Sequence, residues 1–493
     1  MSIILDGMCV KFIFINLKAG EVMNSQKTQS ANPSGLAVGK EFLLTIKRIG
    51  INGEGIGYYK RQVVFVPNTL PDEEVIVRAT KVERGYAEAE LVRIRKKSPH
   101  RVEPPCPIYK ECGGCTLQHV DYEEQLKYKR DLVLGALDKY CRLPVEKFTV
   151  RKTIGMKNPW SYRNKSQLQV SNRDNILSVG LYKENTHDVV DLSRCLVQRK
   201  ELNEVVQVMK KLIKKYDISI YNEKKHKGWL KTIVTRVAIK TGEIQLVFVT
   251  LNDEFPHRDE LVADIRKRLP NVESIMQNVN DKKTSLIFGE DTKCISGSSV
   301  IEERLGDLTF ELSPRAFFQL NPEQTVTLYN EVKKAARLTG EEYVVDAYCG
   351  VGTIGMWLAN DAAEVRGMDM IPEAIEDARE NAEINGFNNL RYITGKAEVI
   401  LPRWKKEDFV PDVVVVDPPR IGLDDELMRT LLQLRPHKIV YVSCNPSTLA
   451  KDLEVLGKLY HASYIQPVDM FPQTSQVETV TLLQLRKYFK DGN

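Results

Sequence analysis

The sequence predicts an α/β protein whose C-terminal part is a doubly wound parallel sheet, with a small β-barrel and a mixed α+β region before it. Two observations carry this prediction. Strand and helix patterns alternate from about residue 310 onward, and short alternating strands with glycine turns fill residues 39–99. The expected parallel strands are residues 343–348, 364–370, 390–395, 412–419 and 438–444. Residues 463–471 and 478–485 have no helix between them and fit an antiparallel hairpin at one edge.

These patterns divide the chain into four segments. Residues 1–38 are expected to be a disordered or wrongly included extension, because a polar run follows a second possible start at Met23, an alternative to Met1. The other expected segments are an RNA-binding barrel over 39–99, a central domain with a cysteine group over 100–305, and the doubly wound domain over 306–493.

Composition excludes some classes of protein and leaves others open. The 493 residues exceed one compact core, and the net charge of +5, from 71 basic and 66 acidic residues, does not by itself imply nucleic acid. The basic residues are bunched, however, and each bunch is either a solvated face or a phosphate contact. The two groups are Arg93, Arg95, Lys96, Lys97 and Arg101, and Lys210, Lys211, Lys214, Lys215, Lys224, Lys225 and Lys227.

The sequence also indicates where the protein works. No apolar run approaches the roughly 18 residues of a membrane span, and the first residues lack the basic start of a signal peptide. Nine cysteines without a secretion signal indicate a reducing cytoplasm, where clustered cysteines bind metal more often than they form disulfides.

A glycine-rich loop between the first predicted strand and a helix is typical of a nucleotide cofactor site. Gly350, Gly352 and Gly355 let the backbone approach a ligand, and Asp369 closes the next strand, where a carboxylate can accept two ribose hydroxyls. The same spacing is the dinucleotide fingerprint, so the loop alone fits a nicotinamide cofactor as well as S-adenosylmethionine.

The fourth and fifth strands carry the more specific signals. Asp417-Pro-Pro-Arg420 ends the fourth strand, and Arg420 stands where enzymes that methylate exocyclic amines tend to place an aromatic ring. Cys444 ends the fifth, with Asn445 as a helix cap after it, so the positive end of a helix is expected to favour the thiolate. Cys444 is either a nucleophile or a small buried side chain, and its position favours the nucleophile; Cys349 is interpreted as packing.

A nucleophilic cysteine beside a methyl donor suits a pyrimidine. Carbon 5 of uracil is a weak nucleophile, and thiolate addition at C6 places charge on C5, which then attacks the sulfonium methyl group. A base must next remove the C5 proton, and Glu478 on the final hairpin is the candidate. The target base must be unpaired or flipped out.

These motifs resemble the family of RNA uridine C5-methyltransferases, most closely the branch that modifies 23S ribosomal RNA, from about residue 39 to the C-terminus. The resemblance implies a Rossmann-like S-adenosylmethionine-dependent domain, a TRAM-like RNA-binding barrel, Cys444 as nucleophile and Glu478 as base. Residues 317–321 (Phe-Phe-Gln-Leu-Asn) and 162–165 (Tyr-Arg-Asn-Lys) are also family-like. The cofactor contacts, loop glycines included, are expected at Gln319, Tyr348, Gly350, Gly352, Asp369 and Asp417.

Four cysteines form a candidate metal site. Cys106, Cys112 and Cys115, with Cys195, leave an iron–sulfur cluster and a zinc ion both open on spacing, whereas the resemblance implies a [4Fe–4S] cluster. The spacing is not that of radical enzymes. The family's tRNA-modifying members typically lack both this site and the barrel, so the resemblance favours 23S ribosomal RNA as the partner.

Two positions depart from the family pattern: Asp369 stands where glutamate is usual, and Gln476 replaces a histidine. Four alternatives remain: a tRNA uridine C5-methyltransferase, a cytosine C5-methyltransferase, a metal-bearing RNA-binding assembly factor without catalysis, and a nicotinamide oxidoreductase. No membrane or obligate protein partner is expected, and the chain is expected to be a monomer. The sequence does not identify the uridine.

Overall fold

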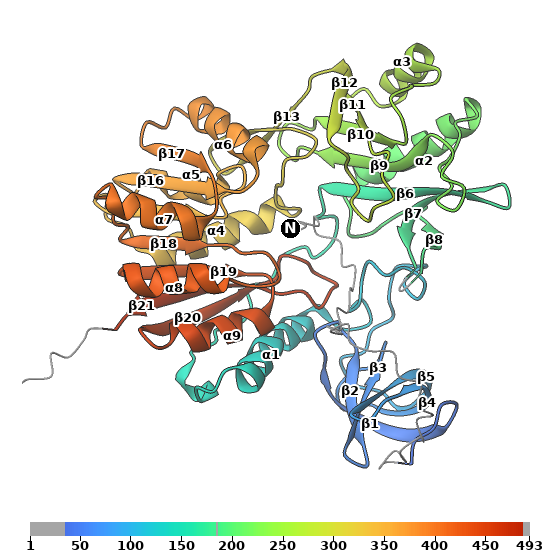
Figure 1. The fold of residues 1–493 in the computed structure, drawn as a ribbon. Coiled ribbons are helices and arrows are strands. Elements are labelled where there is room, and N and C mark those ends of the chain that lie inside the picture. Colours follow the sequence, from blue (N-terminus) through green and yellow to red (C-terminus); the bar gives the residue numbers. More distant parts are fainter. Residues whose placement is uncertain (1–34, 184–185, 487–493) are drawn as a thin grey trace, which may run out of the picture. The chain divides into compact units, whose positions relative to one another are not determined.

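The computed structural model describes residues 35–183 and 186–486, which fall into two compact units (Figure 1). The smaller unit holds residues 35–128 and 473–475, and the larger unit holds the other described residues from 129 onward. The predictions for the N-terminal extension and its start at Met23 fall on residues 1–34, outside the described residues. The division into four segments stays a prediction.

The smaller unit contains a closed barrel, as predicted. Its strands are β1 (Glu41–Ile49), β2 (Gly55–Tyr59), β3 (Gln62–Val66), β4 (Glu74–Val82) and β5 (Tyr86–Lys96), in the order β1-β2-β3-β5-β4. Buried and exposed positions alternate along β1 because successive side chains of a strand point to opposite faces. Apolar side chains from all around the barrel, among them Phe42, Ile46, Val64 and Val77, fill its interior.

The larger unit contains two seven-stranded sheets and most of the helices. The helices are α1 (Tyr122–Tyr140), which begins before this unit, η1 (Val145–Lys147), α2 (Lys200–Lys215), α3 (Arg258–Arg268), α4 (Pro322–Ala336), α5 (Thr353–Ala359), α6 (Pro372–Ile384), α7 (Ala397–Lys406), α8 (Asp425–Leu434) and α9 (Pro446–Leu456). No helix of the described residues is long and apolar enough to cross a bilayer.

The first sheet, called here the central sheet, is mainly antiparallel and has the order β12-β11-β10-β9-β6-β7-β8. Its strands are β6 (Lys165–Arg173), β7 (Ile176–Tyr182), β8 (Val189–Asp191), β9 (Leu230–Val237), β10 (Ile244–Thr250), β11 (Val272–Val279) and β12 (Asp291–Gly297). Helices α2 and α3 pack on it, and β10 is buried along its whole length. A hairpin, β13 (Ile301–Leu305) and β14 (Leu308–Leu312), follows.

The second sheet, called here the parallel sheet, confirms the predicted doubly wound domain. Its strands are β15 (Tyr343–Ala347), β16 (Glu364–Asp369), β17 (Leu390–Thr394), β18 (Val413–Val416), β19 (Lys438–Ser443), β20 (Tyr460–Val468) and β21 (Glu478–Leu485). The order is β17-β16-β15-β18-β19-β21-β20, in which the first five strands are parallel. Strand β21 is antiparallel to β19 and to β20, which is the predicted edge hairpin.

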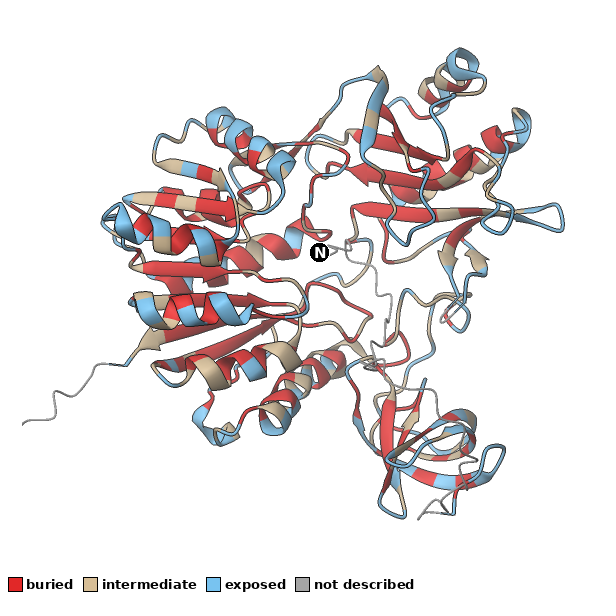
Figure 2. Ribbon diagram, viewed as in Figure 1, coloured by how far each residue is buried: buried red, intermediate tan, exposed pale blue. Residues whose placement is uncertain are grey.

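Burial explains why this sheet reads as continuous apolar runs. All four valines of β18 are buried, because helices cover both faces of a parallel sheet (Figure 2). In sheets of this kind ligands bind at the carboxyl ends of the strands, and the candidate residues lie there.

Candidate active site

Polar residues meet at the carboxyl edge of the parallel sheet. The last residue of β15 pairs with the last residue of β18 and with the penultimate residue of β16. Tyr348, Asp369 and Asp417, three of the predicted cofactor residues, are therefore neighbours across three adjacent strands. The register of the parallel strands fixes their proximity.

Cys444 and Glu478 are brought together by the pairing of β19 with β21. The last recorded pair of this antiparallel ladder is Ser443 with Thr479, and the Thr479 hydroxyl donates to the Ser443 carbonyl at 3.4 Å. The residues next to this pair are Cys444 and Glu478, and the Glu478 carboxylate is near enough to contribute, after burial, to raising the pKa of Cys444. Glu478 is 7 % exposed and Cys444 is half-buried.

The turn after Cys444 is tied to the turn after β18. Asn445 caps α9 as expected, because its side-chain oxygen accepts the Ser447 N–H at 3.1 Å. Its amide nitrogen donates to the Arg420 carbonyl at 2.8 Å. The Thr448 hydroxyl approaches the same carbonyl at 3.4 Å. One capping residue thus holds the cysteine strand and the Asp-Pro-Pro-Arg turn together.

The surroundings of Cys444, Asp417 and Glu478 disfavour the ionised form of each of these side chains. Burial, with the Asp417 carboxylate adding to it and Arg420 opposing it, raises the pKa of Glu478 to about 8. Burial alone raises the pKa of Asp417 to about 7. The pKa of Cys444 lies well above its usual value because of burial first, and then because of the Glu478 and Asp417 carboxylates. The expected thiolate-favouring effect of the helix end is therefore outweighed in the ligand-free protein.

The cofactor loop has a backbone that demands its glycines. Gly350 and Gly352 have φ of 54° and 81°, and a Cβ on Gly352 would lie 2.6 Å from the Tyr392 hydroxyl. Tyr348, with φ of 68°, takes the left-handed conformation without being glycine, a strained geometry that is common at ligand sites. Cys349 is buried in this loop, in keeping with a packing role.

Asp369 braces this loop with both carboxylate oxygens. Its Oδ2 accepts the Gly350 N–H at 3.1 Å, and its Oδ1 accepts the Ile371 N–H at 2.9 Å. Each oxygen keeps a lone pair that a ribose hydroxyl could use.

Asp346 is a residue of the site to which the sequence analysis gave no role. Its Oδ2 accepts the Gly355 N–H at 2.8 Å, while its Oδ1 is buried and has no hydrogen-bond partner among the described residues. Burial raises the pKa of Asp346 to about 8. An unpaired buried acceptor is costly unless a proton or a ligand satisfies it, so Oδ1 suits a bound group that brings a donor. The signal in the sequence is an acid that ends the first strand just before the glycines.

Gln319 lies in the segment that leads into α4, and α4 connects two parts of the site. The Tyr329 hydroxyl and the Thr353 hydroxyl are 2.8 Å apart, which ties α4 to the start of α5 after the cofactor loop. The carboxylates of Asp417 and Glu478 both contribute to raising the pKa of Tyr329. Gln319 itself is half-buried.

Comparison with known proteins identifies the family. The model described as tRNA (Uracil-5-)-methyltransferase matches residues 121–486, and the TRAM domain model matches residues 36–92. The chain belongs to this family of RNA uracil-5-methyltransferases.

Relatives and a solved structure agree with this assignment. An uncharacterized RNA methyltransferase of Bacillus anthracis is 58 % identical over 458 residues, covering 93 % of this chain and 100 % of its own. One from Enterococcus faecalis is 51 % identical, covering 90 % of this chain and 98 % of its own. The Pyrococcus abyssi tRNA (uracil-54, C5)-methyltransferase, solved with S-adenosyl-L-homocysteine, has a TM-score of 0.71 and 30 % identity, covering 90 % of this chain and 100 % of its own.

In this methyltransferase, three buried side chains hold the segment between β20 and the β21 glutamate. Lys129 of α1 forms an ion pair with Asp469 and donates to the Phe471 carbonyl at 3.0 Å. The Tyr162 hydroxyl donates to the Pro472 carbonyl at 3.0 Å. The Asn321 amide donates to the Met470 carbonyl at 2.9 Å.

These contacts give the family-like Tyr-Arg-Asn-Lys motif a structural role. Tyr162 reaches the segment before Glu478, and the Asn164 N–H donates to the Leu320 carbonyl at 3.0 Å, next to Gln319. Asn321 also caps α4 by accepting the Gln324 N–H at 3.2 Å. The motif thus joins the segment that holds Gln319 to the segment before Glu478. Spacing in the sequence did not reveal this connection.

The four candidate metal ligands lie in two different units. Cys106, Cys112 and Cys115 are half-buried in a loop of the smaller unit, where the Cys112 N–H donates to the Ile108 carbonyl at 2.9 Å. The Gly114 N–H approaches the Cys112 Sγ at 3.4 Å. A backbone donor on a cysteine sulfur is the chemistry that iron–sulfur sites use to tune their thiolates.

Cys195 is half-buried in the larger unit, on a loop that α2 holds in place. The Cys195 N–H donates to the Asn203 side-chain oxygen at 2.7 Å, and the Asn203 amide donates to the Cys195 carbonyl at 3.0 Å. One turn along, the Gln207 amide donates to the Ser193 carbonyl at 2.8 Å. The Cys195 backbone is therefore fixed, as a ligand position requires.

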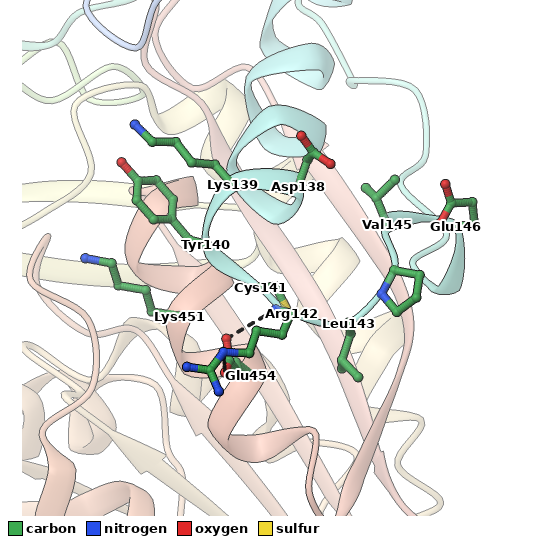
Figure 3. Close-up of a pocket in the computed structure, with 11 residues that line it drawn as sticks. Asp138, Lys139, Tyr140, Cys141, Arg142, Leu143, Val145, Glu146, Lys451 and Glu454 are labelled. Carbon is green, nitrogen blue, oxygen red and sulfur yellow. Dashed lines mark hydrogen bonds and ion pairs between the residues drawn. The ribbon is translucent and has the colours of Figure 1, made fainter. Parts of the chain in front are cut away.

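A separate hollow lies elsewhere on the larger unit. A depression of about 700 Å³ is bounded by the end of α1, η1 and α9 (Figure 3). Its charged lining residues are Lys139, Arg142, Lys451, Asp138, Glu146 and Glu454. These charges balance, and none of the predicted catalytic or cofactor residues lines it, so it is not the active site.

Proposed function

We propose that this protein methylates carbon 5 of a uridine in 23S ribosomal RNA through a covalent adduct between Cys444 and C6. The observation that supports the proposal is the register of β19 and β21, in which Cys444 directly follows Ser443 and Glu478 directly precedes Thr479 of the last recorded pair. A thiol and a buried carboxyl group therefore lie near one another, at the edge where Asp417 follows β18. A nicotinamide oxidoreductase or a non-catalytic binder would not need this pair.

The residues divide the work as follows. Cys444 loses its proton to the Asp417 carboxylate, which leaves Glu478 free, and the thiolate adds to C6 of the uracil. Bound S-adenosylmethionine supplies the methyl group that C5 takes. Glu478 then removes the C5 proton, and the C6–S bond breaks to return the thiolate. A base with a pKa near 8 is a stronger proton acceptor than an ordinary glutamate, which suits a weakly acidic C–H group.

The cofactor loop is suited to the methyl donor. Asp369 offers lone pairs to ribose hydroxyls, and the buried Oδ1 of Asp346 accepts a donor from the ligand. Tyr348, Gly350, Gly352 and Asp417 line the same sheet edge, and Gln319 is proposed to contact the donor from the α4 side.

The choice of RNA is the finer part of the proposal. The four cysteines support ribosomal RNA through the resemblance stated above. Transfer RNA is the second candidate, because the likeness to the archaeal tRNA enzyme extends over 90 % of this chain, so overall architecture does not separate the two substrates.

We also propose that Cys106, Cys112, Cys115 and Cys195 hold a [4Fe–4S] cluster. The sulfur-directed N–H of Gly114 and the fixed backbone of Cys195 support a thiolate ligand set. Methyl transfer needs no electron, so the cluster's role is structural. Protein prepared without oxygen is expected to contain about four irons and four sulfides per chain. Zinc in place of iron would refute the cluster.

The deciding experiment maps 5-methyluridine by mass spectrometry in both ribosomal and transfer RNA from a strain that lacks the protein. We expect one or more ribosomal positions to lose the methyl group. Wild-type protein should restore it, and Cys444→Ala protein should not. Loss confined to transfer RNA would select the second candidate, and no loss in either RNA would overturn the proposal.

A further inference from the structure

The lysines of the basic run in the central domain lie on α2 and on the turn that follows it. On α2, Lys210 pairs with Asp191 at 2.7 Å and Lys215 pairs with Asp264 at 2.5 Å, whereas Lys211 and Lys214 are exposed and form no ion pair with any described residue. On the turn, Lys224, Lys225 and Lys227 are exposed, and none of them forms an ion pair with any described residue. Exposed lysines without an acid partner occur on any solvated face, so what distinguishes the turn is its fixed backbone and the second basic loop beside it.

The turn is held in one conformation by its own side chains. The Asn222 N–H donates to the Lys227 carbonyl at 2.7 Å, and the Asn222 side-chain oxygen accepts the Lys225 N–H at 3.0 Å. The Tyr221 hydroxyl lies 2.9 Å from Nδ1 of His226. Gly228, with φ of 100°, closes the turn, and a Cβ there would lie 2.1 Å from the Ile220 carbonyl oxygen. Three lysines are therefore displayed from a fixed backbone.

A second basic loop lies beside this turn. Lys231 of β9 donates from its ammonium to the Asn280 carbonyl at 2.8 Å and to the Lys282 carbonyl at 3.2 Å. The same ammonium lies 4.7 Å from the centre of the Tyr221 ring. The side chain of Lys231 thus joins the turn to the loop after β11, where Lys283 is exposed and has no ion pair among the described residues (β9 and β11 in Figure 1).

The loop after β11 is fixed by the same device as the turn. The Asn280 amide donates to the carbonyls of Leu286 and Ile287, each at 2.9 Å, and its side-chain oxygen accepts the Lys282 N–H at 3.2 Å. Lys282 itself pairs with Glu290 at 2.7 Å.

We propose that Lys224, Lys225, Lys227 and Lys283, called here the lysine surface, form a binding site for the phosphate backbone of the RNA substrate. The inference rests on the proposed function only in taking RNA as the substrate. It assigns to the central domain a grip on the RNA that is separate from the barrel and from the catalytic edge. Lysines are flexible point charges, so this surface contributes affinity and orientation and does not read the base sequence.

An acidic protein partner is the competing occupant, and the charges favour RNA. Glu223 lies 3.3 Å from His187 and Glu290 pairs with Lys282, which leaves Asp281 as the remaining acid of the two loops, so the four lysines keep an excess of positive charge for a polyanion. A regular row of phosphates can neutralise several such lysines at once and release their counterions.

The test compares two adjacent lysine pairs that differ only in place. Lys224→Gln/Lys225→Gln alters the surface, and Lys405→Gln/Lys406→Gln is the matched control on exposed positions at the end of α7. Binding of a ribosomal RNA fragment is measured from about 50 to 200 mM salt. Each lost phosphate contact should reduce the magnitude of the slope of log K against log salt by about 0.7–0.9, so losing both contacts of the first pair should reduce it by about 1.4–1.8. Adding Lys227→Gln and Lys283→Gln should lower it further.

The control should leave both the slope and the dissociation constant at the wild-type values. A Lys224/Lys225 variant that binds RNA like wild type would overturn the inference, whatever else it fails to bind. Equal losses in both variants would also overturn it, because net charge rather than this surface would then be the cause. The proposed function is judged separately, by whether the wild-type protein methylates the RNA at all.

Discussion

The two seven-stranded sheets of the larger unit place their functional groups in opposite environments. The parallel sheet gathers buried acids, Asp346, Asp417 and Glu478, at its carboxyl edge. The central sheet presents exposed lysines on the turn before β9 and on the loop after β11. The pKa of a buried acid is shifted, and its effect depends on one proton at one position. Exposed cations stay charged, and their effects on binding add up with their number. Substitutions at the parallel sheet should therefore cause large and specific losses of methylation. Substitutions at the central sheet should cause small, salt-dependent losses of RNA binding.

The largest effect is expected for Cys444→Ala. Without the thiol, C5 is never activated, so methylation should fall below detection and no covalent RNA adduct should form. The measurement is a denaturing gel with labelled RNA, using wild-type enzyme and 5-fluorouridine RNA as the positive case, because fluorine cannot leave as a proton does. Cys349→Ala is the matched control at the other strand-end cysteine, and it should still form the adduct. An adduct on Cys444→Ala protein would show that another residue is the nucleophile.

Glu478→Gln should come next. Addition and methyl transfer can proceed, but removal of the C5 proton loses its base, so turnover should fall by about 10²–10⁴ and a methylated adduct should accumulate. A labelled methyl group in the RNA–protein band checks this. Glu454→Gln, at the far end of α9, is a control that should turn over normally. Normal turnover by Glu478→Gln protein would remove the glutamate from the mechanism.

In the wild-type protein, the pH dependence of methylation should differ from the pH dependence of RNA binding, and this difference should distinguish the two sheets. Glu478 must be a carboxylate to act, and with its pKa at about 8 and that of Asp417 at about 7, kcat/KM should rise as pH goes from 6 to 9. RNA binding through the lysine surface should change little over the same range.

The stability of the protein should change with pH in the direction opposite to that of kcat/KM. The folded state holds the Glu478 proton more tightly than the unfolded state does. The free energy of unfolding should therefore fall as pH rises from about 5 to 8. In Glu478→Gln protein the fall should be shallower. A value of kcat/KM that declines from pH 6 to 9 would contradict the assignment of Glu478 as the base.

The smallest effect is expected for Tyr162→Phe, which removes the hydroxyl that holds the Pro472 carbonyl. We expect a loss of about 1 kcal/mol of stability and a release of the adduct that is slower by up to about tenfold. Tyr460→Phe removes a similar bond, 3.0 Å from hydroxyl to the Pro436 carbonyl, at the opposite end of β20, and is the control. Equal release rates in the two variants would show that the first bond only supports the fold.

Much of the site could be predicted from the sequence because strand ends are local features. The apolar runs fixed which residues end the strands, and parallel strands bring their ends to one edge. The sequence therefore placed four candidate residues at strand ends: Cys444, Asp417, Asp369 and Tyr348. The cap at Asn445 was equally local, since an asparagine followed by proline starts a helix by itself.

Other parts depended on contacts between distant residues. The helix end after Cys444 predicted a stabilised thiolate, but burial and two carboxylates raise the pKa of that thiol, and burial is a property of the assembled fold. The pairing of Lys129 with Asp469, 340 positions apart, has no sequence signal.

The lysine run shows the division between the two sources of information most clearly. The sequence by itself determined which segments form the parallel strands, the glycines of the cofactor loop and the identity of each candidate reactive group, because these follow from local pattern and covalent chemistry. Only the tertiary structure decided the order of the strands, and which lysines face acids and which face solvent. It also decided which acids lose their water and that Cys444 lies near Glu478, because burial and register depend on what the rest of the chain packs against each residue.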